Sequence, residues 1–162
     1  MQEVIPLTTG GATWANDNKT LFYSKKDEQT LRSNKIFKHT LGEDSADDVN
    51  VFTEQDETFN TFVYKTKSKK YIVIGSSSTL SSEYQILDAD TPNQEFKIFQ
   101  PRERGLEYSI AHYETSFFIV TNKDGASNFK LMKTPQDKTS KDNWVDEIAH
   151  RDDVLLEDIE IS

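Results

Sequence analysis

The 162-residue sequence contains no cysteine. That absence excludes a disulfide framework, a thiolate-bound zinc site and a cysteine nucleophile. Long hydrophobic runs are also missing, because no stretch approaches the roughly 18–20 apolar residues that span a bilayer. The opening residues, Met1 to Pro6, lack the basic region and apolar stretch of a secretory signal. Together these features favour a protein of the cytoplasm.

Basic charge is scarce as well. The chain carries 28 acidic against 19 basic residues, for a net charge of −9. A phosphate-binding surface normally needs a basic patch. The densest basic cluster, Lys65 to Lys70, is followed by no basic helix. The sequence therefore argues against nucleic-acid binding, and the acidic excess is typical of a soluble surface, with attraction of cationic partners as the alternative.

Short runs with period-two alternation dominate the sequence. They are rich in β-branched and aromatic residues and are bounded by turn formers, which is typical of strands. The clearest are Thr20–Tyr23, Lys35–Lys38, Val49–Phe52, Tyr71–Ile74 and Phe117–Val120. No segment keeps an amphipathic helical stripe for three turns, and the best helical candidate, 143–150, also suits a strand end. The pattern predicts an all-β chain.

The strands recur in groups of four. The second strands of the groups begin at residues 21, 72 and 118, which lie 51 and 46 residues apart. We align the segments Leu21-Phe22-Tyr23, Ile72-Val73-Ile74 and Phe118-Ile119-Val120. Third strands follow at Ile36-Phe37, Ile86-Leu87 and Leu131-Met132, and fourth strands at Val51-Phe52, Ile98-Phe99 and Trp144-Val145. Four strands in each repeat of about 40–50 residues predict the blades of a β-propeller rather than a β-sandwich.

The repeats divide the chain into five parts. We expect the end of a preceding blade at 1–10, three blades at 11–57, 58–104 and 105–152, and the first strand of a next blade at 153–162. The alternating run Val154–Ile161 and the apolar start Val4–Leu7 support the outer two parts. Propellers have about 4–8 blades. The chain is therefore expected to be a segment of a larger propeller.

Several phrases, in order along the chain, resemble the propeller of the oligopeptidase B (protease II) branch of the prolyl oligopeptidase family of serine peptidases. They are Trp14–Tyr23, Ser78–Glu83, Leu87–Asp90, Pro101–Ser109 and Thr121–Leu131. The resemblance covers nearly the whole chain, although no family phrase falls within 136–143. It implies a seven-bladed propeller that caps an α/β-hydrolase domain in a cytoplasmic enzyme. It also implies cleavage after Arg or Lys by a Ser-Asp-His triad in the hydrolase domain, and no triad position lies in the matched region.

Two serine motifs in the chain come near to the pattern of a nucleophile elbow. That elbow needs Gly-x-Ser-x-Gly at a strained turn from strand to helix. Gly75–Thr79 and Gly125–Phe129 match the first three positions and fail at the last, and both lie between strands. We therefore interpret the cluster Ser76–Ser82 as a hairpin loop.

Histidines and paired acidic residues are the remaining candidates for chemistry. The three histidines, His39, His112 and His150, lie far apart in sequence, and a triad or zinc site would require them to converge with other groups. We interpret them as structural. The acidic pairs suit turns better than metal sites; they are Asp47-Asp48, Asp88 with Asp90, and Asp152-Asp153. We predict no catalytic, metal or cofactor-binding residue.

The sequence thus predicts a non-catalytic propeller segment that controls access to a hydrolase domain of the same polypeptide. The parent enzyme would hydrolyse short basic peptides. A free-standing propeller-like module that binds proteins through its loops is the alternative. Sheets that lack a neighbour at either end would leave apolar faces bare, so we also expect the isolated segment to self-associate.

Overall fold

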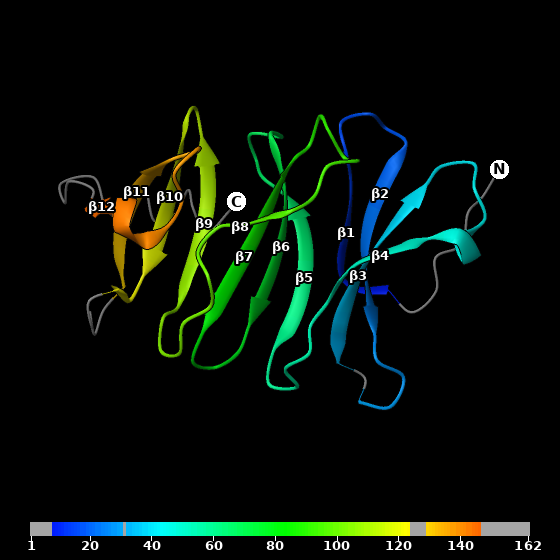
Figure 1. Cartoon of the computed structure of the whole chain (residues 1–162), viewed down its shortest axis with the longest axis horizontal. Coiled ribbons are helices and arrows are strands. Elements are labelled where there is room, and N and C mark those ends of the chain that lie inside the picture. The colour runs from blue at the N-terminus through cyan, green and yellow to red at the C-terminus, as the bar shows by residue number, and fades with distance from the viewer. Residues whose placement is uncertain (1–7, 31, 124–128, 147–162) are drawn as a thin grey trace.

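The computed structural model of the chain describes residues 8–30, 32–123 and 129–146. Those residues form twelve strands in three four-stranded sheets (Figure 1). They contain no α-helix, and their helical segments are short 3-10 turns. Across the same part of the chain, no helix has the length and apolar character needed to cross a membrane. The predicted all-β fold is confirmed.

Each sheet is an antiparallel meander, with strands adjacent in sequence also adjacent in space. The first sheet consists of β1 (Thr8–Trp14), β2 (Thr20–Lys26), β3 (Ser33–Thr40) and β4 (Val49–Thr53). The second consists of β5 (Asn60–Lys65), β6 (Tyr71–Ser77), β7 (Ser82–Asp88) and β8 (Lys97–Ile98). The third consists of β9 (Tyr108–Tyr113), β10 (Ser116–Thr121), β11 (Lys130–Pro135) and β12 (Val145–Asp146). The 3-10 turns are η1 (Ser45–Asp47) and η3 (Lys141–Asn143).

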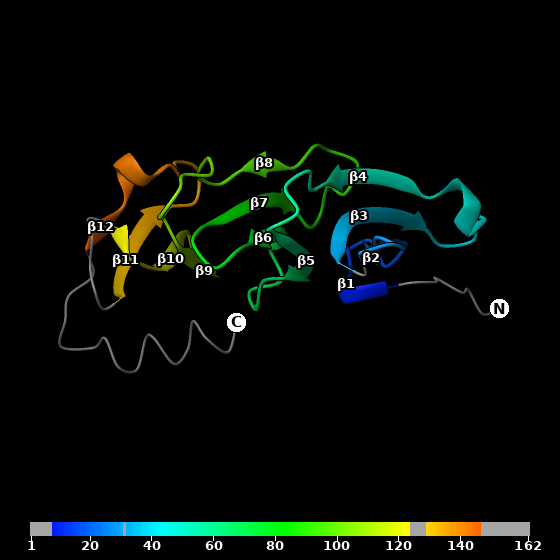
Figure 2. The same cartoon turned by 90° about the horizontal axis from the view of Figure 1, so that it is seen from below.

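The three sheets stand side by side, face against face (Figure 1). In Figure 2 the first strands β1, β5 and β9 lie toward one side of the assembly, and β4 and β8 lie toward the opposite side. This is the arrangement of successive propeller blades, in which the first strand of each blade lies nearest the central channel. The predicted set of about three four-stranded blades is therefore confirmed.

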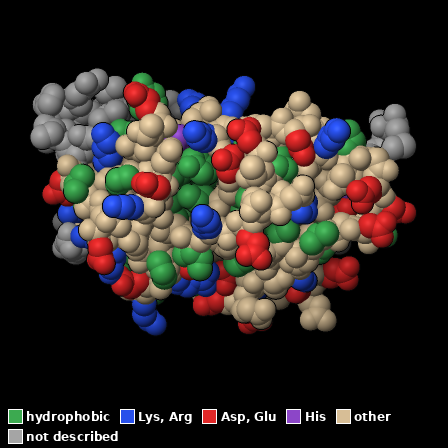
Figure 3. Space-filling model, turned by 45° about the horizontal axis from the view of Figure 1, so that its top comes forward, with side chains coloured by type: hydrophobic (Ala, Val, Ile, Leu, Met, Phe, Trp, Pro, Cys, Tyr) green, Lys and Arg blue, Asp and Glu red, His purple; other side chains and the backbone are tan. Residues whose placement is uncertain are grey.

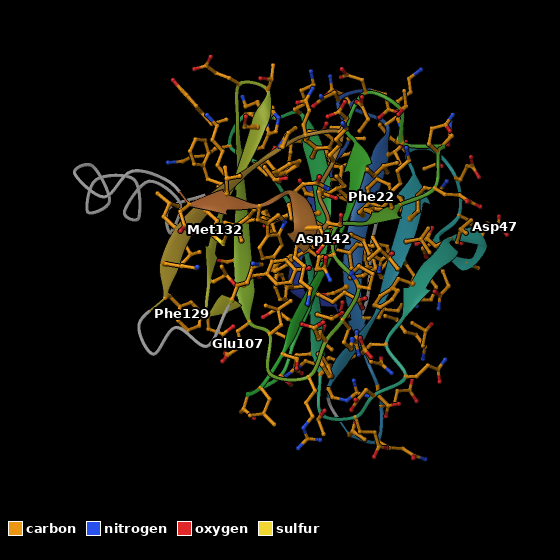
Figure 4. All side chains as sticks on the ribbon, turned by 60° about the vertical axis from the view of Figure 1, so that its left-hand side comes forward. Phe22, Asp47, Glu107, Phe129, Met132 and Asp142 are labelled. Carbon is orange, nitrogen blue, oxygen red and sulfur yellow. The ribbon has the colours of Figure 1, made fainter. Side chains whose placement is uncertain are left out.

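The first and second sheets share an apolar core. Phe22 and Ile36 of the first sheet are fully buried there, against Val63, Ile72 and Ile74 of the second. In Figure 4, Phe22 lies in the interior between these sheets. β-branched and aromatic residues at alternate positions of β2, β5 and β6 therefore pack face to face, as their period-two spacing predicts.

The interface between the second and third sheets is richer in aromatic side chains. The rings of Phe99 and Phe117 meet edge to face, with centroids 4.9 Å apart. The rings of Tyr84 and Tyr108 lie 5.2 Å apart. The buried members of this cluster are Val73, Tyr84, Ile86, Phe99, Leu106, Tyr108, Ile110, Phe117, Ile119, Met132 and Trp144. Such aromatic pairs add about 0.5–1.5 kcal/mol each beyond their buried area.

The register of the second strands confirms one predicted equivalence and corrects another. Leu21 pairs with Trp14 across the first hairpin, and Ile72 pairs with Lys65 at the matching position of the second. In the third sheet the matching residue is Phe117, so the predicted start of this copy at Phe118 was one residue too late. The run from residue 117 to 120 is apolar throughout, so alternation could not fix its phase, and a one-residue slip exchanges the two faces.

This register defines two faces for each sheet. We call the face that carries Leu21, Ile72 or Phe117 the front face, and the opposite face the back face. The back face of the first sheet packs on the front face of the second. The back face of the second sheet packs on the front face of the third. One kind of interface therefore occurs twice.

Gly75 on β6 lies beneath two aromatic rings of the second sheet's back face. It pairs with Phe62 on β5 and with Tyr84 on β7. A Cβ atom added at Gly75 would lie 2.4 Å from the Phe62 ring and 2.8 Å from the Tyr84 ring. Real Cβ atoms do not approach other atoms so closely, so the absence of a side chain lets both rings cover the strand.

We expect Gly75→Ala to lower the free energy of unfolding by about 2–3 kcal/mol, in the upper range of measured overpacking costs. Urea unfolding followed by tryptophan fluorescence measures the change, with Ser77→Ala on the same strand as control. Adding Phe62→Ala to Gly75→Ala should give less destabilisation than the two single changes together, because the closer of the two clashes is removed. A Gly75→Ala variant as stable as the wild type would contradict the packing described here.

Candidate functional site

The serine motif in the second sheet does not form a nucleophile elbow. Ser76 lies within β6, is buried, and its hydroxyl donates to the hydroxyl oxygen of Thr61 at 3.3 Å. The hairpin loop comprises only residues 78–81, so the predicted loop over Ser76–Ser82 was too long by the strand residues at both ends. The loop is closed by Ser78, which bonds Ser81 through its backbone amide at 2.9 Å. The other serine motif, 125–129, falls mostly outside the described residues.

His112 is the histidine that comes nearest to a catalytic arrangement. Its Nδ1 lies 2.8 Å from the Ser68 hydroxyl, and its Nε2 lies 2.8 Å from the Gln136 side-chain oxygen. Since an amide oxygen only accepts, Nε2 carries the proton and Nδ1 accepts from Ser68. Burial lowers the pKa of His112, a change opposed by the Gln136 hydrogen bond and assisted by the positive charge of Lys70. The imidazole is thus kept neutral.

This Ser-His-Gln chain differs from a triad in two respects. The neutral amide of Gln136 cannot stabilise an imidazolium as a carboxylate does. Ser68 lies in the turn between β5 and β6, and no helix follows it. His112 belongs to β9 of the third sheet, while Ser68 belongs to the second. The hydrogen bonds therefore join two sheets at one end of their interface.

His39 lies on the front face of the first sheet in a second polar cluster. Its Nδ1 lies 2.5 Å from an Asp48 carboxylate oxygen, and both side chains are almost fully buried. The hydroxyl of Tyr23 donates to the other oxygen of the same carboxylate. Burial, and then the Asp48 carboxylate, raise the pKa of Tyr23 above its usual range. The contacts fix the start of β4 against β2 and β3. His150, the third histidine, lies outside the described residues.

Of the acidic pairs within the described residues, Asp88 with Asp90 serves a turn as predicted, whereas Asp48 of the other pair bonds His39 and Tyr23. Asp88 accepts a hydrogen bond from the backbone amide of Asp90 at 2.8 Å, and Asp47 lies in η1, which Asp44 caps. Asp47 is exposed at the outer end of the β3–β4 connection (Figure 4). Over residues 8–30, 32–123 and 129–146, no group of three or more His, Asp or Glu residues is placed to hold a metal ion. The pair Asp152-Asp153 lies outside this part of the chain.

Arg102 forms the most extensive charged cluster that the structure describes. Its guanidinium donates to both oxygens of Glu54, at 2.9 and 2.6 Å, and to Glu83 at 2.9 Å. It also lies over the Phe59 ring, 3.9 Å from the centroid. Glu54 and Phe59 lie in the connection from the first to the second sheet, whereas Glu83 is on β7. One guanidinium therefore ties that connection to the second sheet.

The Arg102 guanidinium determines the direction in which the pKa of Glu54 is shifted. Burial alone would raise the pKa of Glu54, because only 4% of its side chain is exposed. Hydrogen bonds from Arg102 and from the backbone amide of Asp56 outweigh burial and hold the pKa below its usual value. Bidentate contacts of this kind are the stronger class of ion pair.

A polar contact also closes the opposite end of the interface between the first two sheets. Asn16, in the β1–β2 turn, accepts from the Lys65 ammonium at 2.9 Å. Its side-chain amide donates to the Lys69 carbonyl and to Asp90, both at 2.8 Å. The interface is thus bonded at both ends with an apolar core between them. Elsewhere the surface shows basic and acidic side chains interspersed (Figure 3).

Comparison with known proteins decides what these sheets belong to. The family described as the prolyl oligopeptidase N-terminal β-propeller domain matches residues 1–162. The chain belongs to this propeller family.

Relatives and solved structures agree with the assignment. The propeller segment is 39% identical to a dipeptidyl aminopeptidase BI of Pseudoxanthomonas mexicana and 36% identical to a protease 2 of Moraxella lacunata. These matches cover 98% and 85% of the chain, but only 22% and 20% of the relatives. Oligopeptidase B from Leishmania major superposes with a TM-score of 0.80 at 34% identity, covering 87% of the segment and 20% of that chain. The chain thus spans about a fifth of the length of these proteins.

Sequence reasoning missed the contacts that join the propeller blades. Glu54 and Arg102 are 48 residues apart, and His112 and Ser68 are 44 apart. Each lies in a loop or at a strand end, where charged and hydroxyl residues are common. The signal that could have found them is the repeat itself, which places the turns and strand ends of adjacent blades side by side.

We expect Arg102→Met to lower the free energy of unfolding at neutral pH by about 2–3 kcal/mol. Removing one partner of a fully buried ion pair costs about 3–5 kcal/mol, and the Arg102 side chain is 27% exposed. Arg104→Met, at an exposed neighbouring position, is the matched control and should change stability little. Chemical denaturation at pH 7 measures both.

The same variant should show an altered pH dependence. In the wild type the lowered pKa of Glu54 contributes stability above the ordinary carboxyl pKa, and this is lost as pH falls through the lowered value. Without Arg102, burial raises the pKa, so protonation relieves the uncompensated charge. The gap between Arg102→Met and wild type should therefore shrink toward about pH 4, near the ordinary carboxyl pKa. A gap that is constant or grows on acidification would contradict this account.

Proposed function

We propose that this propeller segment forms part of the wall of a cap that restricts access to the active site of an oligopeptidase B-like serine peptidase. The observation that carries the proposal is the closure of both interfaces between blades. Each has an apolar core, and polar contacts lie at both ends of the first interface and at one end of the second. Such a wall would keep folded proteins out, and short peptides would reach the active site by another route.

The catalytic groups in this proposal belong to an α/β-hydrolase domain of the same polypeptide. The propeller would have seven blades, and the substrates would be short peptides cleaved after Arg or Lys. Similarity to oligopeptidase B and to protease 2 supports this branch of the family. The absence of cysteine supports a location in the cytoplasm, where disulfides are rare.

We also propose that the 162-residue chain, on its own, associates with further copies of itself. Large apolar side chains are exposed on the outward faces of its first and third sheets, among them Trp14 and Tyr113, which are 40% and 63% exposed. In the interior the corresponding faces are covered by neighbouring blades. Burial of such faces gains roughly 25 cal/mol for each Å² removed from water.

The chain alone should hydrolyse no peptide bond, because its described serines lack an elbow and a carboxylate-supported histidine. The assay is release of chromophore from a short peptide ending in arginine, with labelling by a serine-directed fluorophosphonate as a second readout. Ser68→Ala is the control for the Ser68–His112 pair. Turnover that the fluorophosphonate abolishes would contradict the non-catalytic role.

The cap itself is tested in the complete polypeptide that carries this segment. Arg102→Met should loosen the first interface and increase cleavage of a small folded protein several-fold relative to a short chromogenic peptide. Arg104→Met should leave that ratio unchanged. If Arg102→Met folds and the ratio does not move, this part of the propeller does not control access.

A further inference from the structure

Two sheet faces in the described part of the chain have no other sheet packed on them. One is the front face of the first sheet, which carries Trp14, Leu21 and Phe37. The other is the back face of the third sheet, which carries Tyr113, Phe118 and other apolar side chains. Trp14 is 40% and Tyr113 63% exposed, and the rings of Phe37 and Phe118 are half-buried. On the first of these faces Tyr23 and His39 are buried beneath Asp48, and apolar surface is exposed at Trp14; on the second face it is exposed at Tyr113.

The two unpaired faces are of opposite kinds. Each observed interface joins the back face of one sheet to the front face of the next. The described residues leave one front face and one back face without a sheet packed on it, and these faces are the two halves of an interface of the same kind. Two equal faces meeting front to front or back to back would repeat neither observed interface.

One polar contact recurs in both observed interfaces. A front-face residue near the end of the first strand reaches the hairpin turn of the preceding sheet. Lys65 bonds Asn16 at 2.9 Å in the first interface, and His112 bonds Ser68 at 2.8 Å in the second. Lys65 pairs with Ile72 and His112 with Phe117, as Trp14 pairs with Leu21. Trp14 thus occupies the position that contacts a preceding turn.

The turn that corresponds to this position lies at the other end of the chain. It joins β9 to β10 through Glu114 and Thr115, and Tyr113 lies at its base. The ring of Tyr113 contacts that of Phe118 on the back face, with centroids 6.5 Å apart. An indole beside an exposed tyrosine at a sheet edge is a favourable aromatic pairing.

We propose that the chain associates head to tail, with the front face of the first sheet in one copy docked on the back face of the third sheet in the next. Trp14 packs on Tyr113 and the β9–β10 turn of that copy. The inference rests on the proposed self-association and specifies its geometry. Two copies bring six sheets together, within the range of about 4–8 blades that closed propellers have. A head-to-tail contact either closes into a ring or continues as an open chain.

The experiment uses the 162-residue chain and two single substitutions at exposed positions, Trp14→Glu and Tyr113→Glu. Sedimentation velocity over micromolar concentrations reports association. Wild type should form dimers or larger species, and each variant alone should associate at least tenfold more weakly. Leu80→Glu, in the hairpin loop between β6 and β7, is the matched control because Leu80 is 52% exposed and lies on neither face. It should associate like the wild type.

Mixing the two variants separates head-to-tail docking from other modes. Trp14→Glu keeps an intact back face and Tyr113→Glu keeps an intact front face, so an equimolar mixture should recover association as a heterodimer. A variant that dimerises alone, or a mixture that stays monomeric while wild type associates, overturns the proposed geometry. A wild type that stays monomeric overturns self-association, yet leaves the capping role intact, since that role is tested by cleavage ratios in the complete polypeptide.

Discussion

Face-to-face packing of sheets is the constraint on which the rest of this structure depends. A four-stranded antiparallel sheet with apolar residues on both faces is stable only when both faces are covered. Here the second sheet has this environment, since Ile72 and Ile74 face the first sheet and Val73 faces the third. The short fourth strands add few backbone hydrogen bonds. Packing between the sheets therefore contributes more to the stability of the segment than strand pairing within them.

Polar contacts refine this packing at the ends of each interface. The apolar core has no directional preference, whereas the bonds from Arg102 to Glu54 and between His112 and Ser68 form only in one relative position of the sheets. These contacts fix how adjacent blades meet and close the ends of the interface.

Much of the fold could be predicted from the sequence, for a physical reason. Alternating apolar residues in short runs define strands. Their recurrence in groups of four defines blades, because each blade packs its apolar faces against its neighbours in the same way. The phase of Phe117–Val120 could not be read, since every residue in the run is apolar and either face was possible. The contacts of Glu54, Arg102 and His112 could not be predicted either, because they depend on which loops become neighbours in space. The exact blade boundaries remain predictions.

Native-state hydrogen exchange of the 162-residue chain tests the central claim most directly. If packing between sheets carries the stability, the amides of β6 and β7, in the sheet covered on both faces, should exchange slowest and only through global unfolding. The matching amides of β2 and β10, in sheets covered on one described face, should exchange faster. Equal protection in all three sheets, or faster exchange in the second, would contradict the claim that the interfaces hold this propeller segment together.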